Sequence, residues 1–219
     1  MFESLDLRVG AGGLLVVHGP GGSGRTSLLL ALAARMRLDS GAVRVGGHLL
    51  PGAERQVRDL VAVARAEPAV GLDGRLRVSE LIAERRILTP KTAWRRIDDA
   101  FEVVDLQVPG RELVRDLSPA DGLLLAVALA LAAEPAAIVV DDVDRSCPAA
   151  DHTRLWQALS RVCATGCTVL AGACDPPGAL DPTPALVALP RLSRNRLPGT
   201  GQEGRTQQCP APHVTEECA

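Results

Sequence analysis

A glycine-rich segment near the N-terminus constrains the fold more than any other part of the sequence. It reads G-P-G-G-S-G-R-T-S over residues 19–27, follows the apolar run 14–18 and leads into the strong helix formers of residues 26–36. A strand, a glycine-rich turn and a helix in this order are typical of a phosphate-binding loop. Glycines let backbone amides turn toward a phosphate, and the helix N-terminus adds positive potential. We therefore predict a phosphate site here rather than a glycine-rich turn without a ligand.

The residues of this loop include groups that we expect to contact phosphate and metal. Thr26 supplies a hydroxyl of the kind that holds Mg²⁺ in such loops. Arg25 stands where the motif G-x-x-x-x-G-K-[ST] has lysine, and the planar fork of arginine is wider than the lysine ammonium. We expect this change to weaken the phosphate clamp. The residues predicted to bind the nucleotide phosphates in this segment are Gly19, Gly21, Gly22, Ser23, Gly24, Arg25, Thr26 and Ser27.

Apolar runs and helical patterns alternate along the rest of the chain. Residues 60–64, 137–140 and 167–173 have the short apolar character of buried strands, and residues 41–46 read as an edge hairpin strand. From residue 78 to about residue 134 the pattern is helical. Strands that alternate with helices predict an α/β fold with a parallel sheet covered on both faces.

Charge and hydropathy exclude some kinds of partner. The net charge of −2 gives no overall attraction to nucleic acid or to anionic lipid. The longest apolar run, residues 123–133, is shorter than the roughly 18 residues of a membrane span, and the N-terminal residues do not resemble a signal peptide. We expect a cytoplasmic protein that binds no nucleic acid, does not insert into the membrane and reaches it only through a partner.

Several motifs occur in an order that resembles the ATP-binding cassette of ABC transporters over residues 2–175. The phosphate loop is similar to the family's G-P-N-G-S-G-K-T-T-L, L-S-P-A-D at residues 117–121 resembles its L-S-G-G-Q signature, and A-I-V-V-D-D at residues 137–142 resembles Walker B. The resemblance implies a P-loop NTPase core with a parallel sheet, edge antiparallel β-strands and an inserted helical subdomain. The core falls at residues 1–77 and 135–175, the helical signature subdomain at 78–134, and an extended or disordered tail at 176–219.

The same resemblance assigns roles outside the loop. Asp141 corresponds to the aspartate that serves Mg²⁺ together with Thr26, and Asp142 stands at the position of the glutamate that polarises the attacking water. Cys174 stands at the switch histidine, and Ala66 or its neighbour stands at the Q-loop glutamine. Ser118 of the signature segment, which as an N-cap followed by proline begins a helix well, is expected to face ATP bound by a second cassette.

These departures concern catalytic groups more than binding groups. The side chain of Asp142 is one methylene shorter than that of glutamate, and misplacing a reacting group by about 1 Å can cost on the order of 100-fold in rate. Cys174 cannot donate a strong hydrogen bond to a γ-phosphate, and Asp121 brings a negative charge to the signature segment. Catalysis by Asp142 and Cys174 is therefore expected to be weak.

The resemblance implies an ATP-binding subunit that binds ATP and Mg²⁺, pairs with a second cassette in a homodimer or heterodimer, and couples to an integral membrane permease with weak hydrolysis. The alternative is a regulatory or assembly subunit of a membrane complex that binds nucleotide without hydrolysing it. A soluble ABC protein of translation or repair usually has paired cassettes or long coiled-coil inserts, for which the chain is too short. A small P-loop kinase leaves residues 117–121 unexplained.

Overall fold

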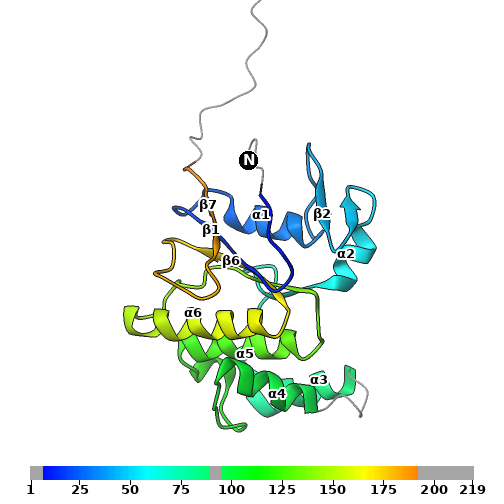
Figure 1. The fold of residues 1–219 in the computed structure, drawn as a ribbon. Helices are drawn as coiled ribbons and strands as arrows, with labels where there is room; N and C mark the ends of the chain where they lie inside the picture. The colour runs from blue at the N-terminus through cyan, green and yellow to red at the C-terminus, as the bar shows by residue number, and fades with distance from the viewer. Residues whose placement is uncertain (1–6, 89–94, 192–219) are drawn as a thin grey trace, which may run out of the picture.

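The computed structural model describes residues 7–88 and 95–191. Its centre is a parallel sheet with the strand order β4-β5-β6-β1-β7 (Figure 1). Because all neighbouring strands of this sheet are parallel and helices lie in the chain between β1, β4, β5 and β6, the predicted α/β class with a parallel sheet is confirmed. The strands are β1 Leu14–His18, β4 Val61–Arg65, β5 Ala137–Val140, β6 Thr168–Ala173 and β7 Ala185–Ala188.

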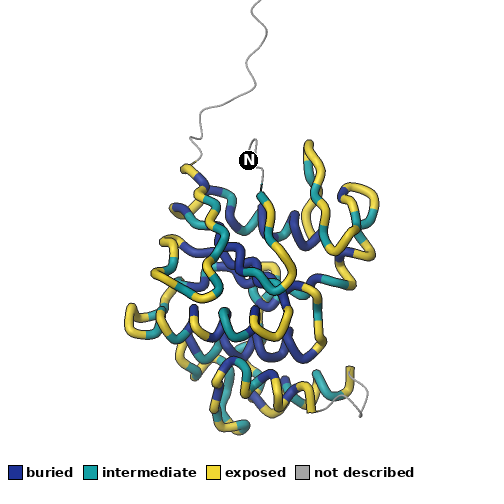
Figure 2. Tube along the Cα trace, in the orientation of Figure 1, coloured by how far each residue is buried: buried dark blue, intermediate teal, exposed yellow. Residues whose placement is uncertain are grey.

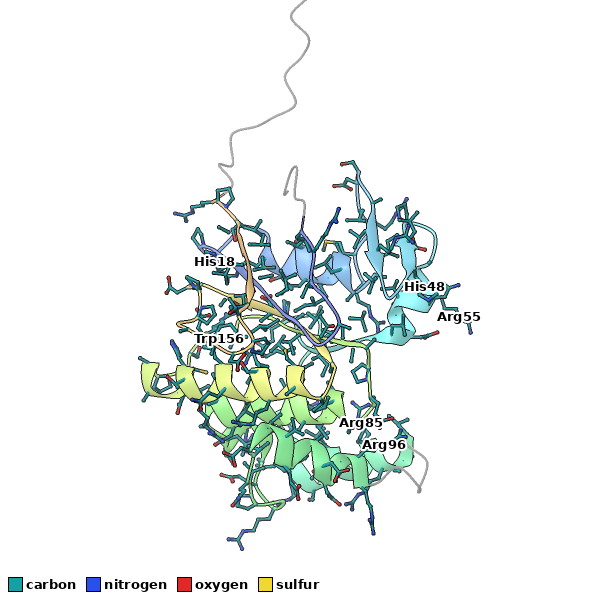
Figure 3. The ribbon with its side chains drawn as sticks, viewed as in Figure 1. His18, His48, Arg55, Arg85, Arg96 and Trp156 are labelled. Carbon is teal, nitrogen blue, oxygen red and sulfur yellow. The ribbon has the colours of Figure 1, made fainter. Side chains whose placement is uncertain are left out.

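A small antiparallel hairpin stands apart from this sheet. It consists of β2 Val43–Val45 and β3 His48–Leu50, which pair only with each other within the described residues. Figure 3 shows His48 on this hairpin, away from the central strands. The residues predicted as an edge strand thus form a separate two-stranded sheet, followed by a short helix, α2 Glu54–Leu60.

Helices cover the two faces of the central sheet. Helix α1 Arg25–Leu32 lies on one face, and α6 Ala149–Ala164 lies with α5 Pro119–Leu131 on the other (Figure 1). A hydrophobic core lies on each face of the sheet, and alternate side chains of β1 contribute to each. Leu14 and Val16 pack on the side of α5 and α6, whereas Leu15 and Val17 pack on the side of α1. Trp156 of α6 is buried and points toward the sheet (Figure 3).

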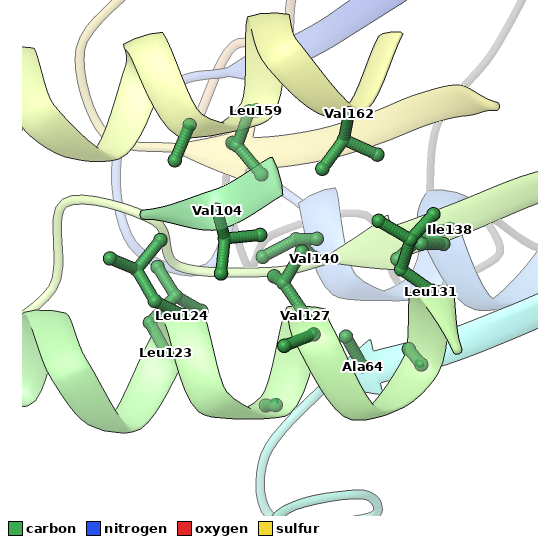
Figure 4. Packing of buried hydrophobic residues seen from close by; sticks show 14 of the residues in the cluster. Ala64, Val104, Leu123, Leu124, Val127, Leu131, Ile138, Val140, Leu159 and Val162 are labelled. Atoms are coloured by element: carbon green, nitrogen blue, oxygen red, sulfur yellow. The ribbon is translucent and has the colours of Figure 1, made fainter. Parts of the chain in front are cut away.

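The range predicted to be helical contains helices and no strand in its described part. Helices α3 Val78–Leu88 and α4 Arg95–Val104 and the 3-10 turn Val114–Asp116 precede α5. From residue 123 to its end, helix α5 is apolar on all sides and is buried between α4, α6 and the sheet, as Figure 2 shows by its dark colour and Figure 4 by its packing against Ile138 and Val140. Complete burial explains why its sequence lacks the polar stripe of a surface helix.

The C-terminal boundary of the core differs from the prediction. Strand β7 pairs in parallel with β1, the Leu189 amide donates to the His18 carbonyl oxygen at 2.8 Å, and the Leu189 side chain is buried. The prediction of an extended or disordered tail at residues 176–219 is therefore wrong for residues 185–189, because these residues belong to the core sheet. Prolines flank this short strand, and an edge strand tolerates them. Residues 192–219 of the predicted tail lie outside the described residues.

Candidate functional site

The phosphate loop connects the end of β1 to the start of α1. Gly24 caps α1 in the left-handed conformation with φ of 95°, no side chain caps the helix, and no acidic residue lies in its first turn. The first-turn amides of α1 are thus left to a ligand, and the helix dipole favours an anion there. The Ser23 hydroxyl is buried in the loop without a hydrogen-bond partner among the described residues. An uncapped helix start beside an orphaned hydroxyl fits a phosphate group.

The two residues predicted to hold the metal converge at this loop. The Thr26 hydroxyl donates a hydrogen bond to Asp141 Oδ2, and the other oxygen, Oδ1, accepts from the Asp142 amide at 2.9 Å. Asp141 is buried, and burial raises the pKa of its carboxyl, with the charge of Asp142 adding to the effect, while the Thr26 hydrogen bond opposes it. A hydroxyl and a carboxylate side by side suit Mg²⁺, which takes one or two protein oxygens and completes its shell with phosphate and water.

The described part of the chain offers no larger set of metal ligands than this pair. Within residues 7–88 and 95–191, no group of three His, Cys, Asp or Glu side chains could hold a metal ion. A metal ion at this pair would take its remaining ligands from nucleotide phosphates and water. When bound, such an ion would supply positive charge against the phosphates, and the residues present to hold it are Thr26 and Asp141.

Arg25 has its guanidinium turned into the protein. One terminal nitrogen donates to the Gly19 carbonyl oxygen, and the other, Nη2, lies 2.8 Å from Asp142 Oδ1. Burial acts against the charge of Arg25, but the hydrogen bond and charge of Asp142, helped by Cys174, raise the pKa of the guanidinium overall. The structure thus brings together three positions that the sequence predicts to depart from the family motifs: Arg25, Asp142 and Cys174.

Two further arginines surround Asp142, and both were missed from the sequence. Arg145 Nη1 lies 3.1 Å from Asp142 Oδ2, so each carboxylate oxygen faces a guanidinium. Arg65 is the last residue of β4. Its Nε donates to the main-chain carbonyl oxygen of Asp141 at 3.2 Å, and its Nη2 donates to the main-chain carbonyl oxygen of Asp142. The carboxyl ends of neighbouring parallel strands lie at one edge of a sheet, so the position of Arg65 after an apolar run was the available signal.

Backbone contacts hold residues 173–175, the predicted switch segment, in place. The Asp144 carboxylate accepts from the amides of Cys174 at 2.7 Å and Asp175 at 3.1 Å. The Gly19 amide in turn donates to the carbonyl oxygens of Ala173 and Cys174 at 3.3 and 3.2 Å. The main chain at residue 174 is therefore fixed against the phosphate loop without any contribution from a histidine side chain.

The sequence predicts the Q-loop position at Ala66 or its neighbour, and the structure shows how these residues lie. Ala66 is fully buried, and its amide and carbonyl groups both bond within the turn that reaches Val70. Glu67 instead lines a hollow of about 330 Å³ together with Asp141 and Asp142. Both neighbours of Ala66, Arg65 and Glu67, line this hollow, and we take Glu67 as the predicted Q-loop position because its side chain matches glutamine in length.

Ser118 begins α5, as its sequence context predicts. Its hydroxyl accepts from the Asp121 amide at 3.1 Å and donates to Asp121 Oδ2 at 2.7 Å, and Pro119 occupies the first turn. Asp121 also pairs with Arg154 at 2.8 Å, which offsets its charge. Ser118 lines the same hollow as Asp141 and Asp142. Contact of Ser118 with ATP of a second cassette stays a prediction.

A parallel sheet with a glycine-rich loop between β1 and α1 and an aspartate after a neighbouring strand is the arrangement of a P-loop nucleotide-binding protein. Comparison with protein families matches the one described as ABC transporter to residues 2–144. The chain belongs to the ABC transporter family, and the resemblance carried by its motifs is confirmed.

Relatives and solved structures agree with this assignment. The chain is similar to the daunorubicin resistance ATP-binding protein DrrA3 of Streptomyces coeruleorubidus, with 30% identity over 170 residues that cover 77% of this chain. The matched region spans about half of that relative, 54% of its length. The fold is similar to the ADP conformation of MJ1267, an ATP-binding cassette of an ABC transporter, with a TM-score of 0.68, 16% identity, and coverage of 82% of this chain and 77% of that one.

A third comparison concerns a dimer. The fold is also similar to the cassette MJ0796, solved as a dimer in a post-hydrolysis state bound to ADP and Pi, with a TM-score of 0.62, 18% identity, and coverage of 80% of this chain and 83% of that one. At these identities the two structures show the fold alone. Within the described residues, no helix combines the length and the apolar character that a membrane crossing needs.

Proposed function

We propose that this chain is the ATP-binding subunit of an ABC transporter and that it binds ATP with Mg²⁺ at residues 19–27. The observation that carries the proposal is the convergence of the Thr26 hydroxyl and the Asp141 carboxylate beside the uncapped start of α1. In this arrangement the loop amides bind the phosphates, Thr26 and Asp141 hold the metal, and Arg25 supplies positive charge. The names of relatives such as DrrA3, an ATP-binding protein, support ATP as the nucleotide.

Coupling ATP binding to transport across a membrane requires partner proteins. We propose an integral membrane permease as one partner, which would place the chain at the cytoplasmic face of the membrane. A second cassette, identical or different, is the other, and the dimer of MJ0796 supports this arrangement. In such a dimer Ser118 of one subunit would face the nucleotide of its partner. The net charge of −2 does not favour a nucleic-acid partner.

Hydrolysis at this site is expected to be weak. A carboxylate that orients water accepts a hydrogen bond or proton from it, and the guanidinium groups of Arg25 and Arg145 at the two oxygens of Asp142 compete with water for this carboxylate. This pairing favours the second candidate function, a subunit that binds nucleotide and regulates or assembles a membrane complex without hydrolysis. ATP turnover of the purified chain, alone and with its membrane partner, distinguishes the two.

Replacing Thr26 and Asp141 together by alanine is expected to abolish Mg²⁺-dependent ATP binding, because both protein oxygens of the metal site are lost. Titration calorimetry of MgATP measures the effect. A matched control is the double variant Thr165→Ala with Asp73→Ala. Thr165 donates within the end of α6, and Asp73 pairs with Arg75 on the surface, so both are remote from the loop. Equal affinity of the Thr26/Asp141 variant and the unmodified chain would remove this site from consideration.

A further inference from the structure

Two departures from the family motifs contact each other directly. Arg25 replaces the loop lysine and Asp142 replaces the Walker B glutamate, and Nη2 of the first lies 2.8 Å from Oδ1 of the second. The two side chains are largely buried, with 9% of Arg25 and 22% of Asp142 exposed. The guanidinium of Arg25, which is wider than a lysine ammonium, thus pairs with the carboxylate of Asp142, whose side chain is shorter than that of glutamate.

The pair occupies the part of Arg25 that a phosphate would use. Guanidinium groups bind carboxylates and phosphates through the same planar arrangement of donors. Here one terminal nitrogen donates to the Gly19 carbonyl oxygen and the other to Asp142, while Nε is buried without a partner among the described residues. The Asp142 carboxylate therefore takes the place of a phosphate oxygen at this cation.

The backbone keeps Asp142 in this position. Its φ is 51°, in the left-handed region, and Arg65 donates to its carbonyl oxygen. Its amide donates to Asp141 Oδ1 at 2.9 Å, so the residue is anchored on both sides of Cα. Arg145 lies 3.1 Å from the second carboxylate oxygen, so the carboxylate keeps a cation if Arg25 leaves.

From these contacts we propose that Asp142 is a positioning residue: it holds Arg25 in the nucleotide-free chain and competes with nucleotide phosphate for the guanidinium. The proposal rests on the proposed nucleotide site. It follows that the Arg25 and Asp142 replacements act as one linked change and that nucleotide phosphate competes with the Asp142 carboxylate for the Nη2 side of the Arg25 guanidinium. The free chain gains stability from the pair, and nucleotide affinity is lowered by the same interaction.

A four-protein cycle tests this competition: the unmodified chain, Asp142→Asn, Arg25→Gln and the double variant. Asparagine is nearly isosteric with aspartate and tolerates the left-handed backbone at this position. MgATP and MgADP affinities are measured by calorimetry, and the stability of each nucleotide-free protein by urea unfolding. Asp73→Asn is the matched control, since Asp73 also pairs with an arginine, Arg75 at 2.8 Å, but on the exposed surface.

Asp142→Asn is expected to tighten MgATP binding on the order of tenfold when Arg25 is present, a coupling of ordinary size. In the Arg25→Gln background the same substitution is expected to change affinity by less than about threefold, because only the general effect of removing a nearby charge remains. The nucleotide-free Asp142→Asn protein is expected to unfold at a lower urea concentration, and Asp73→Asn to leave nucleotide affinity unchanged.

Other outcomes distinguish failure of the proposed competition from failure of the proposed nucleotide site. Equal tightening in both backgrounds, or weaker binding by Asp142→Asn, would overturn the competition while leaving the nucleotide site in place. Absence of MgATP binding in all four proteins would overturn the proposed function and the competition with it. If Arg25→Gln fails to fold, Arg25→Lys takes its place, and the expectation is again a smaller effect of Asp142→Asn than in the unmodified chain.

Discussion

Restoring the family residue at four positions together is expected to raise single-turnover ATP hydrolysis by more than the product of the four single gains. Phosphoryl transfer depends mainly on positioning and electrostatic stabilisation, so each missing contact raises the barrier. Loss of a positioned general base alone typically costs about 10²–10⁴-fold. Groups that act as a unit are strongly non-additive. The four substitutions are Arg25→Lys, Glu67→Gln, Asp142→Glu and Cys174→His.

The contacts of the site explain why single substitutions should recover little. Arg25→Lys by itself leaves Asp142 too short and still paired with Arg145, and Asp142→Glu by itself still faces the Arg25 guanidinium. The measurement is single-turnover hydrolysis of the single variants and the combined variant. Arg55→Lys with Asp99→Glu, conservative changes on exposed parts of α2 and α4, provides the control. Full recovery from Arg25→Lys alone would show that the other three positions are wrongly assigned.

Gly172→Ala is expected to lower both the stability of the fold and the Mg²⁺-dependent affinity for ATP. A Cβ atom on this β6 residue would lie 2.1 Å from Asp141 Oδ1 and 3.0 Å from Leu29 Cδ1. Asp141 cannot move away cheaply, because its oxygens bond to Thr26 and to the Asp142 amide. Overpacking of this kind costs roughly 1–3 kcal/mol of unfolding free energy, and a displaced Asp141 carboxylate would leave Thr26 as the only remaining ligand of the proposed metal site.

Urea unfolding followed by tryptophan fluorescence measures the stability effect of Gly172→Ala, since Trp156 is buried in the core. Gly122→Ala is the matched control: nothing lies within 4 Å of its Cβ position, and it is inside α5. Alanine is favoured over glycine in a helix by roughly 0.5–1 kcal/mol, so the control is expected to be neutral or stabilising. An unfolding midpoint and a MgATP affinity equal to those of the unmodified chain would refute the role assigned to Gly172.

The parts of the fold that could be predicted have a local physical signal. The phosphate loop depends on glycines between an apolar run and helix formers, and β5 is a short apolar run that ends in two aspartates. The start of α5 was predicted from Ser118 and Pro119, because capping involves only neighbouring residues. Such signals are complete within a few residues of the chain.

The remaining features depend on contacts between distant segments. Arg25 meets Asp142 across 117 positions of sequence, and Arg65 reaches the Asp142 carbonyl oxygen across 77. No local sequence pattern signals either contact. From the sequence, Arg25 and Asp142 are therefore two independent departures from the motifs, whereas in the structure their side chains form an ion pair. Strand β7 was missed for a related reason, because its pairing with β1 rather than its own short sequence makes it a strand.

Single-turnover hydrolysis of MgATP by the unmodified chain, measured beside MgATP binding on the same preparation, tests the central claim most directly. In the proposed site, residues 19–27 with Thr26 and Asp141 bind the nucleotide and metal, while the catalytic positions are poorly suited to hydrolysis. We predict binding that requires Mg²⁺, with a hydrolysis rate on the order of 100-fold or more below that of the combined variant. A rate in the unmodified chain equal to that of the combined variant, or hydrolysis that persists in the Thr26→Ala, Asp141→Ala protein, would contradict the account.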